Sequence, residues 1–192
     1  MRRPLTFTAT ETRELLLSWA VLGLAFAILF NRGISANLAF LITLIIALII
    51  TAVAFILHEL AHKIAANHYG CQATYHANKQ WLFIALIMSF FGFIFAAPGA
   101  VMIQGRITKK EQGIIALAGP ATNAAAALLF LPLITIVPLI ASPLVLINAL
   151  IATFNLLPLP GFDGSKILAW NKSIYALSIL TSIVITVTAY TL

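Results

Sequence analysis

An uncharged apolar run from Ala36 to Leu57 leads directly into the five residues His58-Glu59-Leu60-Ala61-His62. A run of this length is long enough to cross the hydrocarbon core of a bilayer as a helix. On a helix, residues four positions apart lie on one face, so the two imidazoles can bind the same metal ion. Glu59 is one step round the helix, where it can act as a general base on a water beside that ion. The sequence therefore predicts a metal site near the end of a membrane helix.

The composition is that of a membrane protein. The 192-residue chain is 62% hydrophobic and 8% charged, with a mean hydropathy of +1.07, whereas a soluble domain carries about 25% charged residues. We expect residues 1–192 to form a single integral membrane domain with no extramembrane domain. The net charge of +6 is assigned to loops on one membrane face, so no nucleic-acid partner is expected. The single cysteine, Cys71, excludes an internal disulfide and a cysteine-rich metal site.

Apolar segments bounded by glycine, proline or charged residues predict membrane-spanning helices. Their residue ranges are 15–30, 34–66, 113–140, 143–157 and 174–192. The fold class expected is an all-α membrane protein, a polytopic bundle of about five transmembrane helices. Residues 82–103 are also apolar, but Gly92, Pro98 and Gly99 interrupt them. This segment could therefore either span the membrane or dip into it and return.

The distribution of positive charge distinguishes these two topologies. If residues 82–103 cross the membrane, the lysines and arginines are almost evenly divided between its two sides. If they re-enter, all 11 lysines and arginines except Arg32 lie on one side, which the positive-inside rule identifies as the cytoplasm. We therefore predict a re-entrant loop or short β element between the second and third spans, with the N-terminus in the cytoplasm. This topology also brings Asp163 to the membrane side at which the second span ends.

A third metal ligand is needed because a catalytic zinc site commonly has three protein ligands and one open position. Asp163 is the best candidate. It lies in the stretch from Asn155 to Gly164, where two prolines two residues apart cannot continue a helix. Helices that break at membrane depth commonly hold ions. The alternative is that Asp163 only caps a short helix over residues 164–170.

Together these motifs resemble the site-2 proteases, a family of intramembrane zinc metalloproteases. The residues His58-Glu59-x-x-His62 match the first family motif, and Asn155-x-x-Pro158-x-Pro160-x-x-Asp163-Gly164 matches the second. A further element often found between them is matched by Gly119-Pro120-x-x-Asn123. The chain departs from many relatives at Ser165, where they have a second glycine. It also has no room for the PDZ or CBS domain that many carry, and some have six spans.

The resemblance implies a helical catalytic core over about residues 34–170. In this core His58, His62 and Asp163 would hold one Zn²⁺ ion per chain, and Glu59 would be the general base. Asn155 would help to hold the substrate carbonyl or the oxyanion formed from it. Asn123 remains open between a role towards the substrate and simple packing between helices.

The expected partner is a transmembrane protein substrate within the lipid bilayer. A membrane helix hides its backbone in its own hydrogen bonds, so the substrate must unwind locally. The β-favouring residues 101–103 could then pair with it as an edge strand.

The function expected is regulated intramembrane proteolysis in a prokaryotic cell membrane, with the active-site opening on the cytoplasmic side. One alternative is a membrane metal transporter, which would need several polar sites in series along the spans. The other alternative is an inactive membrane scaffold, which would not need a complete set of ligands and a base.

Overall fold

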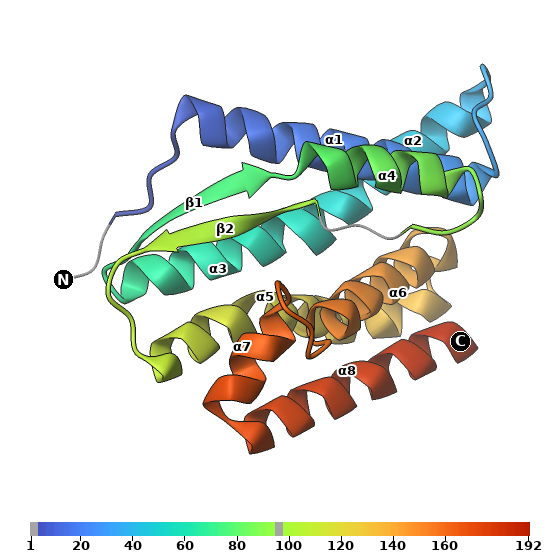
Figure 1. The fold of residues 1–192 in the computed structure, drawn as a ribbon. Helices are drawn as coiled ribbons and strands as arrows, with labels where there is room; N and C mark the ends of the chain where they lie inside the picture. The colour runs from blue at the N-terminus through green and yellow to red at the C-terminus, as the bar shows by residue number, and fades with distance from the viewer. Residues whose placement is uncertain (1–3, 95–97) are drawn as a thin grey trace. The chain divides into compact units, whose positions relative to one another are not determined.

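The computed structural model describes residues 4–94 and 98–192 (Figure 1). Within these residues, five helices are long and apolar enough to cross a membrane. They are Ala9–Asn31, Leu38–His68, Lys109–Thr135, Pro138–Asn155 and Lys172–Thr191. The predicted all-α membrane class with about five spans is therefore confirmed.

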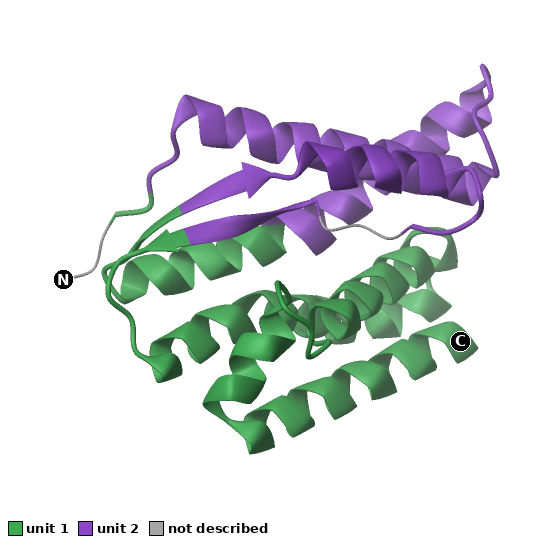
Figure 2. Ribbon diagram, viewed as in Figure 1, with its two compact units in different colours: residues 1–5, 57–73, 103–192 green, residues 6–56, 74–102 purple. Residues whose placement is uncertain are grey.

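The chain divides into two compact units (Figure 2). One unit contains residues 6–56 and 74–102, and the other contains residues 57–73 and 103–192 together with the start of the chain. The metal-site motif and Asp163 belong to the same unit, which is the larger one.

The smaller unit is built on helix α1 (Ala9–Asn31), which packs against α2 (Leu38–Thr51) and α4 (Lys79–Ser89). Gly23 on α1 allows a close approach, because a Cβ at this position would lie 2.5 Å from Leu48 Cδ2. Trp19 adds a hydrogen bond from its Nε1–H to the Leu48 carbonyl at 2.8 Å. Small residues at such contacts are typical of helix packing in membranes, where close van der Waals contact replaces the hydrophobic effect.

Along the chain, two strands that pair into one sheet lie between the second span and the third. Strand β1 (Gln72–Ala77) pairs with strand β2 (Gly99–Gln104), and the two run in opposite directions (Figure 1). Helix α4 between them has 11 residues, far fewer than the roughly 20 that a span requires. The predicted short β element between the second and third spans is therefore confirmed.

The second edge of β1 is closed by side chains rather than by another strand. The Tyr75 N–H donates to Glu11 Oε1 at 3.0 Å, and the Ala77 N–H donates to Glu14 Oε2 at 3.0 Å. Both glutamates lie on α1. The two carboxylates therefore take the place of a neighbouring strand and fix β1 against the first span.

The larger unit is centred on helix α5 (Lys109–Phe130), which packs against α3 (Leu57–His68), α6 (Pro138–Asn155) and α7 (Asp163–Trp170). Helix α8 (Lys172–Thr191) packs against α6. A capping box between Thr108 and Glu111 begins α5, because each residue satisfies a backbone N–H that the first turn leaves free.

The boundary between the third and fourth spans was predicted wrongly. The sequence predicted one helix over residues 113–140, but α5 ends at Phe130 and a 3₁₀ turn follows over Leu131–Thr135. The next helix, α6, begins at Pro138. A proline is favoured in the first turn of a helix because its missing N–H would be unpaired there anyway. Pro132 and Pro138 thus start new helical segments instead of ending a long one.

Replacement of Gly23 by leucine tests the close packing of α1 on α2. The larger side chain must displace Leu48 and Thr51, so we expect the variant to lose about 1–3 kcal/mol of unfolding free energy. Thermal unfolding of the purified protein in detergent measures this loss. The control is Ala20→Leu on the exposed side of the same helix, and an equal loss in both variants would contradict the packing.

Candidate metal centre

The second span changes its helical form just before the metal-site motif. Its α-helical part α2 is followed by a π-helical turn over Ala52–Ile56, and α3 continues from Leu57. Such π turns shift the face that later residues present, and they are frequent at functional sites. His58 and His62 lie one turn apart on α3, and both are buried against α5.

Glycine is required where α5 passes the two imidazoles. A Cβ at Gly119 would lie 2.6 Å from His58 Nε2 and closer still to His62 Nε2. The bare backbone of Gly119 therefore leaves room for these two nitrogens and for an ion between them. This is a structural reason for the glycine of the Gly119-Pro120 pair.

The third predicted ligand reaches the histidines from a broken helix. Helix α6 ends at Asn155, and an irregular loop containing Pro158, Pro160 and Gly161 follows. Asp163 is then the first residue of α7, and no side chain caps this helix. The alternative prediction, in which Asp163 is itself the capping residue, is therefore not what the structure shows.

Two further residues allow the loop to turn sharply into α7. A Cβ at Gly164 would collide with the backbone carbonyl of Leu156, so only glycine allows α7 to begin this close to the end of α6. The Ser165 hydroxyl, at the position where the family pattern often has glycine, donates to the Phe162 carbonyl at 2.8 Å. This bond gives the Phe162 carbonyl a hydrogen-bond partner in the turn that leads into Asp163.

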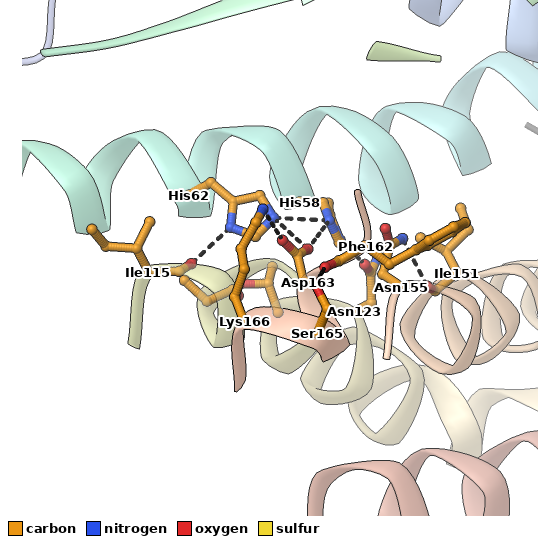
Figure 3. A network of polar contacts seen from close by, with 12 residues as sticks. His58, His62, Ile115, Asn123, Ile151, Asn155, Phe162, Asp163, Ser165 and Lys166 are labelled. Carbon is orange, nitrogen blue, oxygen red and sulfur yellow. Dashed lines mark hydrogen bonds and ion pairs between the residues drawn. The ribbon is translucent and has the colours of Figure 1, made fainter. Parts of the chain in front are cut away.

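The three predicted ligands meet in one buried cluster (Figure 3). The two Nε2 atoms are 3.0 Å apart, and Asp163 Oδ2 lies 3.6 Å from His58 Nε2 and 3.0 Å from His62 Nε2. Ligand atoms bound to one tetrahedral zinc ion at about 2.0 Å would be about 3.3 Å apart. The separations fit a single ion of this size, and the three residues form a group that could hold it.

The outer nitrogens of both rings are already engaged with acceptors. His58 Nδ1–H donates to Asn123 Oδ1 at 2.5 Å, and His62 Nδ1–H donates to the Ile115 carbonyl at 2.7 Å. Each neutral imidazole then carries a lone pair on Nε2, the atom that faces the other ring and Asp163. Only protons on these nitrogens, or a cation between them, can offset the repulsion among lone pairs that lie this close.

Lys166 divides the two oxygens of Asp163 between different partners. Its Nζ donates to Oδ1 at 3.2 Å, which leaves Oδ2 directed at the histidines. Burial alone would raise the pKa of Asp163, but the nearby His62, the contacts with both histidines and the charge of Lys166 together lower it by more. The pKa of this carboxyl therefore lies below its ordinary value, and Asp163 is an anion that can bind a cation.

Glu59 lies beside the cluster without joining it. Its side chain is buried, and its Oε2 has no hydrogen-bond partner among the described residues. A buried carboxylate oxygen without a partner is costly in a folded chain, so it points to a functional role. The position is suitable for a group that holds a water next to a metal ion.

The remaining predicted site residues lie on α5 and α6. Asn123 is fully buried and contacts His58. Asn155 is the last residue of α6, and its amide donates to the Ile151 carbonyl at 3.0 Å.

Sequence reasoning missed three groups that support the cluster. Lys166 could have been found, because a residue three positions after Asp163 on a helix lies on the same face. Asn148 on α6 carried a weaker signal, an amide inside an apolar span. The backbone carbonyl of Ile115 carried none, since any residue type could provide it.

The fold and the site together define a polytopic membrane protein with a buried His-His-Asp group able to hold a metal ion. The chain is 40% identical over 166 residues to a protein of Methanocaldococcus jannaschii named "Putative zinc metalloprotease MJ0611". The match covers 80% of this chain and 83% of that protein, and the chain belongs to the same family. No family model and no solved structure matches the chain.

Replacement of Gly119 by alanine tests the close approach of α5 to the cluster. Alanine normally stabilises a helix relative to glycine, but here its methyl group would occupy the space between the two Nε2 atoms. We expect the variant to remain folded and to lose bound zinc, as measured by metal analysis of the purified protein. The exposed control Ala121→Ser on the same helix should keep its zinc. Full zinc content in the Gly119→Ala variant would contradict the predicted position of the ion.

Proposed function

We propose that this chain is an intramembrane zinc metalloendopeptidase of the site-2 protease type. The observation that carries the proposal is the buried cluster of His58, His62 and Asp163, with Oε2 of Glu59 beside it, which has no hydrogen-bond partner among the described residues. The two histidines and the glutamate lie on a helix long and apolar enough to cross a membrane. The name of the Methanocaldococcus relative supports zinc as the metal and peptide hydrolysis as the reaction.

When bound, a zinc ion would supply a Lewis acid that activates a water and polarises a peptide carbonyl. The residues of the chain would carry the proton. Glu59 would accept a proton from the attacking water and later return it to the amine of the leaving fragment. The buried position of Glu59 excludes bulk solvent, which would otherwise compete for the proton and weaken the electrostatic stabilisation of the reaction.

Asn155 is proposed to bind the substrate at the reacting carbonyl. It closes α6 immediately before the irregular loop that leads to Asp163. Its Nδ2 donates to the Ile151 carbonyl of the same helix at 3.0 Å. This carbonyl is part of the backbone of α6, where carbonyls accept the helical hydrogen bonds. An incoming oxyanion could therefore take over this donor at little cost to the helix.

The proposed substrate is a transmembrane protein that unwinds locally. Within the described part of the sheet, the edge of β1 is closed by Glu11 and Glu14, whereas β2 has one edge without a partner strand. An extended peptide can add to such an edge through backbone hydrogen bonds. We propose that β2 binds unwound substrate in this way, and that the cluster opens to the cytoplasm of a prokaryotic cell.

The transporter alternative receives less support from the structure. A transport path through the spans needs several metal-binding groups in series, and one such group is found among the described residues. An inactive scaffold would not explain why a carboxylate oxygen without a hydrogen-bond partner, Glu59 Oε2, is kept buried beside that group. The peptidase proposal accounts for both features.

Replacement of Glu59 by glutamine tests the proposed reaction. The substitution removes the proton acceptor but keeps the shape of the side chain, so cleavage should fall by about 10²–10⁴-fold while the bound zinc remains. The assay uses the purified chain in detergent with a panel of single-pass membrane segments fused to a reporter. The matched control is Glu111→Gln, because glutamine also serves in a capping box.

Three results decide between the functions. Cleavage by the unaltered chain that disappears with a zinc chelator and in the Glu59→Gln variant supports the peptidase. Unchanged cleavage in Glu59→Gln would exclude this residue as the base. Zinc flux into liposomes that is independent of Glu59, together with no cleavage of any segment, would favour the transporter.

Substitution of β2 residues by proline tests the proposed substrate-binding edge. Proline at Met102 removes a backbone N–H and distorts the strand. We expect cleavage to fall by at least about tenfold through a raised KM if β2 binds the substrate backbone. The control is Met102→Thr, which keeps the N–H and the β propensity. Equal activity of the proline variant and the unaltered chain would show that this edge is not used.

A further inference from the structure

A line of hydrogen bonds through two buried asparagine side chains extends from His58 to α6. His58 Nδ1–H donates to Asn123 Oδ1 at 2.5 Å, and Asn123 Nδ2 donates to Asn148 Oδ1 at 2.9 Å. Asn148 Nδ2 in turn donates to the Leu144 carbonyl at 2.8 Å. Both asparagines are fully buried. The line crosses from α3 to α5 and then to α6, all within the larger unit.

The direction of this line is fixed at its far end. A backbone carbonyl can only accept hydrogen bonds, so Asn148 must direct its Nδ2 towards Leu144 and its Oδ1 towards Asn123. The oxygen of Asn148 then faces the Nδ2 of Asn123, which turns the oxygen of Asn123 towards His58. An asparagine side chain has donor and acceptor ends of nearly equal size, so the neighbours alone decide its orientation.

The orientation of Asn123 determines which nitrogen of His58 carries the proton. When the Asn123 oxygen faces Nδ1, the proton is held there and the lone pair lies on Nε2. With Asn123 turned round, its NH₂ group would face Nδ1, and the proton of a neutral ring would move to Nε2. That nitrogen is the one 3.0 Å from His62 Nε2 and 3.6 Å from Asp163 Oδ2, so a proton there would block metal binding.

His62 provides a comparison within the same cluster. Its Nδ1–H donates to the backbone carbonyl of Ile115 at 2.7 Å. This carbonyl belongs to a helix and has no donor end that could be turned towards the ring. His62 therefore needs no further residue to fix its proton, whereas His58 depends on an amide that could face either way.

We propose that Asn148 is a positioning residue of the metal centre. It orients the amide of Asn123 and thereby keeps Nε2 of His58 available for the ion. The inference rests on the metal site of the proposed function and not on the reaction, so it is tested by metal binding alone. Simple helix packing, the usual role of an asparagine in a membrane helix, predicts a different result.

The first measurement is the zinc affinity of Asn148→Leu. Leucine has the same branching as asparagine but cannot accept a hydrogen bond from Asn123 Nδ2, so it removes the contact that we propose orients the Asn123 amide. Loss of the direct outer partner of a ligating histidine commonly lowers metal affinity 10–100-fold, and because Asn148 acts through that partner we expect a loss of about tenfold, at the lower end of this range. Competition with a coloured chelator on the purified full chain in detergent measures it. The matched control is Asn67→Leu, a buried amide on α3 that donates to the Pro4 carbonyl, which should leave zinc affinity unchanged.

The second measurement repeats Asn148→Leu in the Asn123→Asp background. An aspartate at this position presents an oxygen to His58 whichever way it turns, so its orientation no longer matters. The leucine substitution should then change zinc affinity by no more than about twofold, the usual scatter of independent effects. Asn148→Ala in both backgrounds, which removes the amide without risk of a clash, is measured in parallel in case the leucine variant does not fold.

Each outcome bears on the proposal. A loss in the original background that disappears with Asn123→Asp supports it. Equal losses in both backgrounds would assign Asn148 to packing, and no loss in either would show that Asn123 needs no orienting partner. If the unaltered chain binds no zinc, the positioning role and the proposed function both fail. If the unaltered chain binds zinc and the variants change zinc affinity as expected, but no membrane segment is cleaved, only the proposed reaction fails.

Discussion

Three lone-pair-bearing atoms held together away from water are the constraint on which the larger unit depends. The Nε2 atoms of His58 and His62 and the Oδ2 of Asp163 lie within 3.6 Å of one another, and the outer hydrogen bonds of the two rings direct lone pairs inwards. In water each of these atoms would be hydrated separately. Burial removes the water, so a cluster of lone pairs with no proton or cation between them costs free energy. A cation shared by the three atoms resolves the conflict, and its binding would contribute directly to the stability of the fold.

The chain builds this cluster from features that would be defects elsewhere. A glycine within α5 weakens a helix, yet Gly119 provides the space beside the two imidazoles. The prolines after α6 end a membrane helix early, yet the break allows Asp163 to begin α7 next to the histidines. A buried carboxylate oxygen without a hydrogen-bond partner is unfavourable, yet Glu59, the proposed general base, has one at Oε2. Local departures of this kind are expected at functional sites, where stability is exchanged for chemistry.

The main parts of the fold and the three members of the His-His-Asp group could be predicted because they are properties of local sequence. Residue spacing on a helix places His58 and His62 on one face, and hydrophobic length defines a span. Paired prolines predict the break before Asp163. The end of the third span was predicted wrongly because a proline can either end a helix or begin one, and the choice at Pro138 depends on packing in the folded chain.

The orientation of the amides behind His58 could not be predicted from sequence. Asn123 and Asn148 are 25 positions apart and lie on different helices, so their contact exists only after α5 and α6 pack together. Lys166, by contrast, follows from helix geometry once α7 is known. The candidate ligands are thus encoded locally, while the groups that contact their outer atoms depend on tertiary structure, as is common for the outer partners of metal ligands.

X-ray absorption at the zinc edge of the purified, zinc-loaded chain tests the central claim most directly. The structure predicts one zinc ion bound only by nitrogen and oxygen at about 2.0 Å, with the scattering pattern of two imidazoles. A sulfur neighbour at about 2.3 Å, which only Cys71 or a methionine could provide, or the signature of fewer than two imidazoles, would contradict it.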